Sequence, residues 1–127
     1  MSLGSFSVSL AVSDLDASRK FYETLGFEVA GGEPDNDWLI LRNGTTTIGL
    51  FQGMFDANIL TFNPGWDGEA NALERFEDIR EIQARLDAGG IELMTRANPD
   101  STGPAAVVLQ DPDGNTIMFD QHVPKPS

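Results

Sequence analysis

An internal repeat constrains this chain more than any other feature of its sequence. Residues 8–29 run from an apolar segment through a helix-like pattern to Gly26 and then into a second apolar segment. Residues 58–95 follow the same order, with Gly89 and Gly90 after the helical pattern. Each copy of a repeat forms one structural unit, so a repeat must be recognised before a fold is assigned. The sequence therefore predicts two similar modules with a cavity between them, and we expect function to lie in that cavity.

The first module reads as one helix and four strands. From Phe6 to Val12 apolar residues alternate with small or polar ones, which is typical of a strand with two unlike faces. Asp14 is a suitable N-cap for a helix that ends at Gly26, and Asn43-Gly44 predicts a two-residue hairpin turn. The later strands are expected at 27–30, 38–42 and 46–52, and the apolar helical stripe at Leu15, Ser18, Phe21, Tyr22 and Leu25.

The second module begins with an expected strand at 58–62, and a polar insert at 63–72 follows it. In the last strand, Ile117 and Phe119 are expected to face the helix, with Met118 and Asp120 on the opposite side. The other strands are expected at 91–95 and 105–110, and the helical stripe at Leu73, Phe76, Ile79, Ile82 and Leu86. The predicted fold is α+β: two βαβββ modules, about 5–54 and 57–123, forming an open barrel-like cup within one domain at 5–124.

Composition narrows the classes of partner. The formal net charge of −12 argues against nucleic acid, because phosphates require a basic surface, and it favours a neutral or cationic ligand over an anionic one. The chain has no cysteine, which excludes disulfides, thiolate metal sites and a cysteine nucleophile and is compatible with the cytoplasm. We expect a cytoplasmic protein with no signal peptide and no membrane partner, because no apolar run is long enough for either.

Three stretches resemble one known family. They are Ala11-Val12-Ser13-Asp14-Leu15, Phe21-Tyr22 followed by Leu25-Gly26-Phe27, and Asp111-Pro112-Asp113-Gly114-Asn115. Together they are similar to the vicinal oxygen chelate superfamily, also called the glyoxalase, bleomycin-resistance and extradiol-dioxygenase family. The resemblance covers nearly the whole chain. It implies the paired βαβββ fold and a homodimer.

The resemblance also implies four positions for the ligands of a divalent metal, usually filled by His and Glu. Here those positions hold Ser7, Gly49 beside Leu50, Asn58 and Met118. Hydroxyl and neutral amide oxygens bind Zn²⁺ or Fe²⁺ weakly, and a thioether prefers softer metals. Since the chain has a single histidine, a two-histidine site cannot form within one subunit. We therefore expect no metal and no other cofactor.

His122 and Asp120 are the candidate catalytic pair. In an extended strand they share one side with Met118, so the carboxylate can orient the imidazole as a general base. Alternatively, His122 is an ordinary exposed residue at the end of the last strand, or the two residues join a metal site formed across a dimer. Trp66 either stacks on a ligand or fixes the polar insert in place. The expected ligand-binding residues are Ser7, Ser9, Phe51, Asn58, Trp66, Met118 and Gln121.

Three functions remain open from the sequence. The leading one is binding of a small neutral or cationic organic molecule in the cup without a metal, as the antibiotic-sequestering proteins of such a family do. The second is a glyoxalase-like lyase or isomerase that uses either an unusual metal site or the His122 and Asp120 pair. The third is a structural or partner-binding dimer whose cup is filled by side chains.

Overall fold

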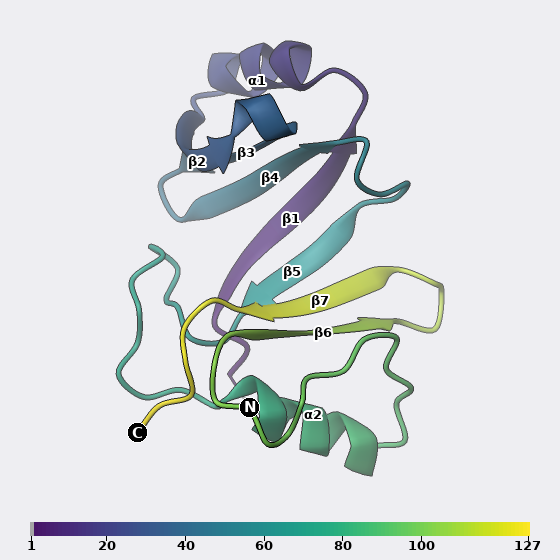
Figure 1. Cartoon of the computed structure of the whole chain (residues 1–127). Helices are drawn as coiled ribbons and strands as arrows, with labels where there is room; N and C mark the ends of the chain where they lie inside the picture. Colours follow the sequence, from purple (N-terminus) through teal and green to yellow (C-terminus); the bar gives the residue numbers. More distant parts are fainter. Residues whose placement is uncertain (1) are drawn as a thin grey trace. The chain divides into compact units, whose positions relative to one another are not determined.

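The computed structural model describes residues 2–127, which form two compact units (Figure 1). The N-terminal unit is Ser7–Ile59, and the C-terminal unit is Leu60–Ser127 together with the residues up to Phe6. Each unit contains one α-helix and part of the β-structure, so the predicted α+β class is confirmed.

The N-terminal unit has the predicted βαβββ order. Its strands lie in the order β2-β3-β4-β1, with β1 parallel to β4 and the other pairs antiparallel. A short 3₁₀ helix, η1 (Pro34–Asn36), joins β2 to β3. The elements are β1 (Ser5–Val12), α1 (Leu15–Thr24), β2 (Glu28–Glu33), β3 (Trp38–Asn43) and β4 (Thr46–Gln52).

The core of this unit lies between α1 and one face of the sheet (Figure 1). Leu15 of α1 packs there with alternate residues of β3 and β4. Tyr22, about two helical turns after Leu15, packs against the same cluster. The predicted helical stripe is wrong in part, because Phe21 is 62% exposed and Leu25 is 57% exposed. At 100° per residue, Phe21 lies about 120° around the helix from Leu15, outside the narrow contact. The buried residues are Leu15, Leu39, Leu41, Ile48 and Leu50.

The C-terminal unit has the order β5 (Ile59–Asn63), α2 (Ile79–Ala88), β6 (Ala105–Gln110) and β7 (Thr116–Gln121), with the strands arranged β5-β7-β6. The strand expected at 91–95 is wrong, since only Thr95 forms an isolated bridge, to Val108. Beyond it, the Gln83 side chain of α2 accepts a hydrogen bond from Ala97 N at 2.7 Å and donates one to Ala97 O at 3.0 Å. The backbone N–H and C=O of Ala97 are therefore hydrogen-bonded to a helix side chain and not to a neighbouring strand.

The start of α2 also differs from the prediction. Leu73 and Phe76 fit the helical period, but the helix begins only at Ile79, because Asp78 caps it and accepts a hydrogen bond from Arg80 N. Ile79 and Ile82 then pack against Val107, Leu109 and Phe119, and Ile117 joins them. The prediction that Ile117 and Phe119 face α2 is confirmed.

The two α-helices have ten residues each. No helix within residues 2–127 is both long enough and apolar enough to cross a membrane.

Candidate functional site

The N-terminus of each helix is capped by one aspartate and one glutamine side chain. In the N-terminal unit Asp14 caps α1, and Gln52 at the end of β4 accepts a hydrogen bond from Leu15 N at 2.8 Å. In the C-terminal unit Asp78 caps α2, and Gln121 at the end of β7 accepts one from Ile79 N at 2.8 Å. The helix N-terminus leaves backbone N–H groups without partners inside the helix, and these carboxylate and amide oxygens satisfy them.

Gln121, which was expected from the sequence to contact a ligand, is part of the cap of α2. Gln121 is 1% exposed, and its amide nitrogen donates to Asp78 Oδ1 at 2.8 Å and to Val123 O at 3.1 Å. Both ends of the amide are therefore used within the C-terminal unit. Because Gln121 is odd-numbered like Phe119, strand alternation already places it on the α2 side.

Three expected ligand-binding residues of the N-terminal unit lie on the sheet face opposite α1. Ser7, Ser9 and Phe51 alternate with the core residues of their strands, and β1 and β4 pair Ser7 with Thr47 and Ser9 with Gly49. Ser9 is almost fully buried, whereas Ser7 and Phe51 are partly exposed. Asn58 is exposed, and its Oδ1 accepts a hydrogen bond from Ala11 N at 3.0 Å.

Phe51 lies in a row of aromatic rings on that face. Its ring centroid is 6.0 Å from that of Trp38, with the two planes parallel within 1°, and 5.4 Å from that of Phe55. A tryptophan in a strand with Leu39, Ile40 and Leu41 is more often a core residue than a site residue. Strand alternation excludes a core position for Trp38, because the neighbouring Leu39 and Leu41 point to α1. Trp38 is thus a candidate functional residue that the sequence reasoning missed.

The residues at the four expected metal positions do not suit a divalent metal. Gly49 has no side chain, and a Cβ built there would lie 2.5 Å from Phe51 Cε2, so the aromatic ring already occupies that space. Asn58 Oδ1 is engaged with the backbone, and Ser7 and Met118 offer only a hydroxyl and a thioether. Within residues 2–127 no three His, Cys, Asp or Glu side chains are grouped closely enough to hold a metal ion.

The C-terminal unit brings three predicted site residues together. His122 Nε2 lies 2.9 Å from Asp120 Oδ2, and the ring centroids of His122 and Trp66 are 4.9 Å apart at an angle of 65°. The hydrogen bond with Asp120 raises the pKa of His122 above its ordinary value of 6.5, while partial burial acts in the opposite direction. Met118 lies two residues before Asp120 and is partly buried on the same side of β7. The arrangement gives an oriented imidazole beside an indole ring.

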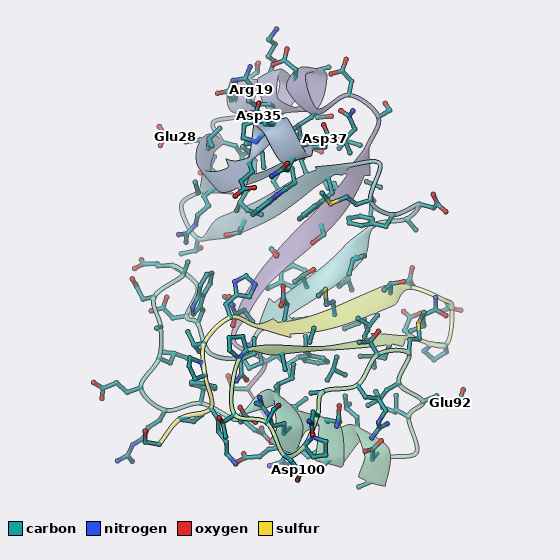
Figure 2. All side chains as sticks on the ribbon, in the orientation of Figure 1. Arg19, Glu28, Asp35, Asp37, Glu92 and Asp100 are labelled. Carbon is teal, nitrogen blue, oxygen red and sulfur yellow. The ribbon has the colours of Figure 1, made fainter. Side chains whose placement is uncertain are left out.

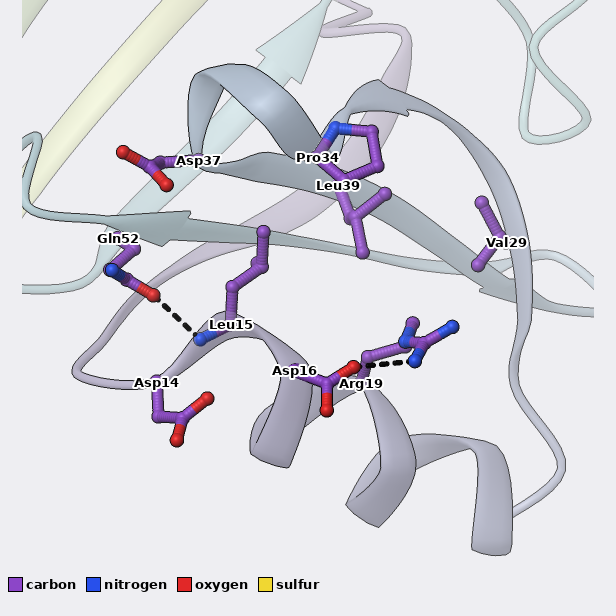
Figure 3. Close-up of a pocket in the computed structure, with 9 residues that line it drawn as sticks. All are labelled: Asp14, Leu15, Asp16, Arg19, Val29, Pro34, Asp37, Leu39 and Gln52. Atoms are coloured by element: carbon purple, nitrogen blue, oxygen red, sulfur yellow. Dashed lines mark hydrogen bonds and ion pairs between the residues drawn. The ribbon is translucent and has the colours of Figure 1, made fainter.

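A pocket of about 530 Å³ lies beside α1 in the N-terminal unit (Figure 3). Its three carboxylates differ in their contacts: Asp14 caps the helix, and Asp16 binds Arg19 and Lys20, whose hydrogen bonds lower the Asp16 pKa. Asp35 lies in η1 and Asp37 directly follows this 3₁₀ helix, so two carboxylates are close together in the chain at this end of the unit (Figure 2). The lining residues are Asp14, Leu15, Asp16, Arg19, Val29, Pro34, Asp37, Leu39 and Gln52.

Comparison with known sequences identifies the family. Residues 4–119 match the Glyoxalase/Bleomycin resistance protein/Dioxygenase superfamily. The chain belongs to this superfamily. A search of curated proteins finds no match.

Solved structures share the fold of this chain. A superfamily member from Vibrio splendidus 12B01 superposes with a TM-score of 0.63 at 18% identity, covering 91% of this chain and 97% of that one. A protein from Legionella pneumophila described as an NAD-dependent benzaldehyde dehydrogenase gives a TM-score of 0.66 at 17% identity, over 92% and 98% of the two chains. At these identities the likeness shows the fold alone.

A catechol 2,3-dioxygenase gives a TM-score of 0.58 at 25% identity, covering 97% of this chain but 40% of that one. This superfamily chain therefore spans about two fifths of the length of the dioxygenase.

Proposed function

We propose that this superfamily member binds a small neutral or cationic organic molecule without a divalent metal. The observation that carries the proposal is the sheet face opposite α1. At the position expected to ligate a metal, that face has Gly49 covered by the Phe51 ring. An aromatic wall with a few hydroxyl groups is typical of a site for a small organic molecule.

Charge supports the choice of ligand. The net charge of −12 disfavours an anionic ligand. The hydroxyl of Ser7, which is partly exposed on β1, can donate or accept hydrogen bonds, so it suits neutral polar groups as well as cations. A carboxylate ligand would instead need a nearby cation to offset its desolvation.

The test is a thermal-shift screen of a small-molecule library in buffer that contains a strong chelator. A ligand that binds only the native state raises the apparent stability by RT ln(1 + [L]/Kd). The proposal expects hits among neutral and cationic compounds, unaffected by the chelator. It is rejected if every hit needs an added divalent cation, or if no compound in a diverse library raises the melting temperature.

A second candidate function rests on the hydrogen bond between His122 and Asp120. With Nε2 directed at the carboxylate, Nδ1 of the same ring is the nitrogen available to accept a proton from a substrate. The test uses hits from the screen in D₂O, with NMR used to detect deuterium entering carbon positions of the bound compound. A lyase or isomerase that removes a proton from carbon predicts exchange that His122→Ala abolishes. Unchanged exchange in that variant, or no exchange at all, leaves binding as the function.

We also propose that the chain forms a homodimer, as the family resemblance implies. Light scattering after size-exclusion chromatography measures the mass directly. A mass of about twice the 13.8 kDa of the chain supports the dimer, and a monomer mass at every concentration rejects it.

A further inference from the structure

We propose that the ligand of this protein is a planar aromatic cation that stacks on the row formed by Trp38, Phe51 and Phe55. This inference rests on the proposed binding function and narrows it to one class of molecule. We call these three rings the aromatic row. The row lies wholly within the N-terminal unit, on the sheet face opposite α1.

The three rings are contiguous. Trp38 and Phe51 are directly opposite each other on the antiparallel strands β3 and β4, and the planes of their two rings are parallel. Phe55, three residues beyond the end of β4, extends the row at 46° to Phe51. Each of the three side chains is only partly buried, so the row keeps exposed aromatic surface.

The hydrophobic core does not need these rings. The buried cluster of the N-terminal unit consists of aliphatic side chains on the opposite face of the same strands, with Tyr22 and Phe27 as its aromatic neighbours. Large aromatic residues that stay outside a core and remain partly exposed mark binding surfaces more often than isolated apolar residues do.

Gly49 is the residue that permits the arrangement. It lies inside β4, where glycine weakens a strand and often marks a close approach. A Cβ at this position would lie 2.5 Å from Phe51 Cε2 and 3.3 Å from Ile40 Cδ1. Any larger residue would therefore displace the Phe51 ring from its place beside Trp38. The position that the family resemblance assigns to a metal ligand serves here to seat an aromatic ring.

The chemistry of the row selects the ligand. Planar rings stack on aromatic side chains because both surfaces are flat and apolar, which saturated rings cannot match. The face of an aromatic ring is electron-rich and attracts a cation, most strongly at tryptophan. The acidic chain adds a favourable long-range field for the same charge.

The test compares two probes of equal charge. N-methylquinolinium is a planar aromatic cation, and decahydroquinoline is a saturated cation of similar size at neutral pH. Titration followed by NMR gives both affinities and shows whether the indole N–H signal of Trp38, identified with Trp38→Phe, shifts on binding. We expect N-methylquinolinium to bind at least tenfold more tightly, with upfield shifts of its ring protons.

Two variants and one control sharpen the test. Gly49→Ala and Phe51→Leu should each weaken N-methylquinolinium binding about tenfold. Gly103→Ala should not, because a Cβ there meets no atom within 4 Å. If Gly49→Ala fails to fold, Phe51→Leu decides alone.

Equal affinities for the two probes, no binding of N-methylquinolinium, or full binding by a folded Phe51→Leu protein would overturn the inference. Library hits that are not aromatic cations would leave the proposed function intact, whereas failure of the whole library removes both.

Discussion

The two helix N-termini are capped by the same two residue types, aspartate and glutamine, in different surroundings. At α1 the aspartate cap is exposed and Gln52 is partly buried, whereas at α2 Asp78 and Gln121 are each 1% exposed. The buried cap has an addition that the exposed one lacks: Arg80 Nη1 lies 2.9 Å from Asp78 Oδ1, and Arg80 also binds Ser101 and the carbonyl of Gly103. Since water competes less for buried polar groups, the same contacts should contribute more to stability at α2.

Comparing the two units also distinguishes features that stabilise the fold from features that we assign to function. The pairing of a cap aspartate with a glutamine from the last strand occurs in both units, so it belongs to the fold. The two units differ in their aromatic rings. Trp38, Phe51 and Phe55 of the N-terminal unit lie on the face opposite α1, whereas Phe62 and Phe119 of the C-terminal unit belong to its core, with Phe6 beside Phe62. The group of His122, Asp120 and Trp66 lies in the C-terminal unit. Features that the repeat does not share are the ones that we assign to function.

The largest expected effect is at the buried ion pair. Arg80→Ala leaves Asp78 charged and buried without its cation, which should cost about 3–5 kcal/mol in the free energy of unfolding. The matched change Arg19→Ala removes one of the two exposed partners of Asp16 and should cost much less, because solvent screens an exposed ion pair. Urea denaturation at pH 7 measures both. Similar losses in the two variants would show that burial does not distinguish the two helix ends.

The next effect compares the two glutamines. Gln121→Leu leaves Ile79 N and Asp78 Oδ1 with one partner fewer in a buried site, and we expect a loss of about 2 kcal/mol. Gln52→Leu leaves Leu15 N nearer to water, and we expect a loss of about 1 kcal/mol or less. Thermal unfolding of the two variants under identical conditions gives the comparison. A larger loss for Gln52→Leu contradicts the account of the caps.

The smallest effect is the pH dependence of the His122 pair. Because the pKa of His122 is raised in the folded state, its contribution to stability is fully present below about pH 6.5 and is lost as the pH rises through the folded-state pKa. Both side chains are partly exposed, so solvent screening should keep the effect below about 1 kcal/mol. Melting temperatures of the native protein and Asp120→Asn between pH 5.5 and 8.5 should differ most at the acid end. A constant difference across that range would contradict the assignment.

Local patterns predicted much of this fold. The strand expected at Thr46–Gln52, after the Asn43-Gly44 turn, is β4 with the bounds that the structure has, and Asp14 and Gly26 placed the limits of α1 well. Alternation also placed Phe119 against α2 and put Asp120 and His122 on one side, where they are hydrogen-bonded. These features depend on residues near one another in the chain.

Contacts between distant residues could not be read in the same way. Gln121 accepts a hydrogen bond from the backbone N–H of Ile79, which lies 42 residues earlier in the chain, so the sequence around β7 does not reveal this contact. Near the strand expected at 91–95, the backbone of Met94 and Thr95 bonds to Val108 of β6 without forming a strand, and Ala97 is bound by Gln83 of α2, which periodicity does not reveal. Trp38 is different, because the alternation of Leu39 and Leu41 in the sequence already indicates that the Trp38 side chain faces away from α1.

The most direct test of the central claim, a ligand-binding superfamily member that needs no metal, is the metal content of the purified protein together with its thermal response to added cations. The account predicts no stoichiometric Zn²⁺, Ni²⁺, Mn²⁺ or Fe²⁺ and no rise in melting temperature when any of them is added. One equivalent of a divalent cation, lost on chelation together with thermal stability and ligand binding, would contradict it.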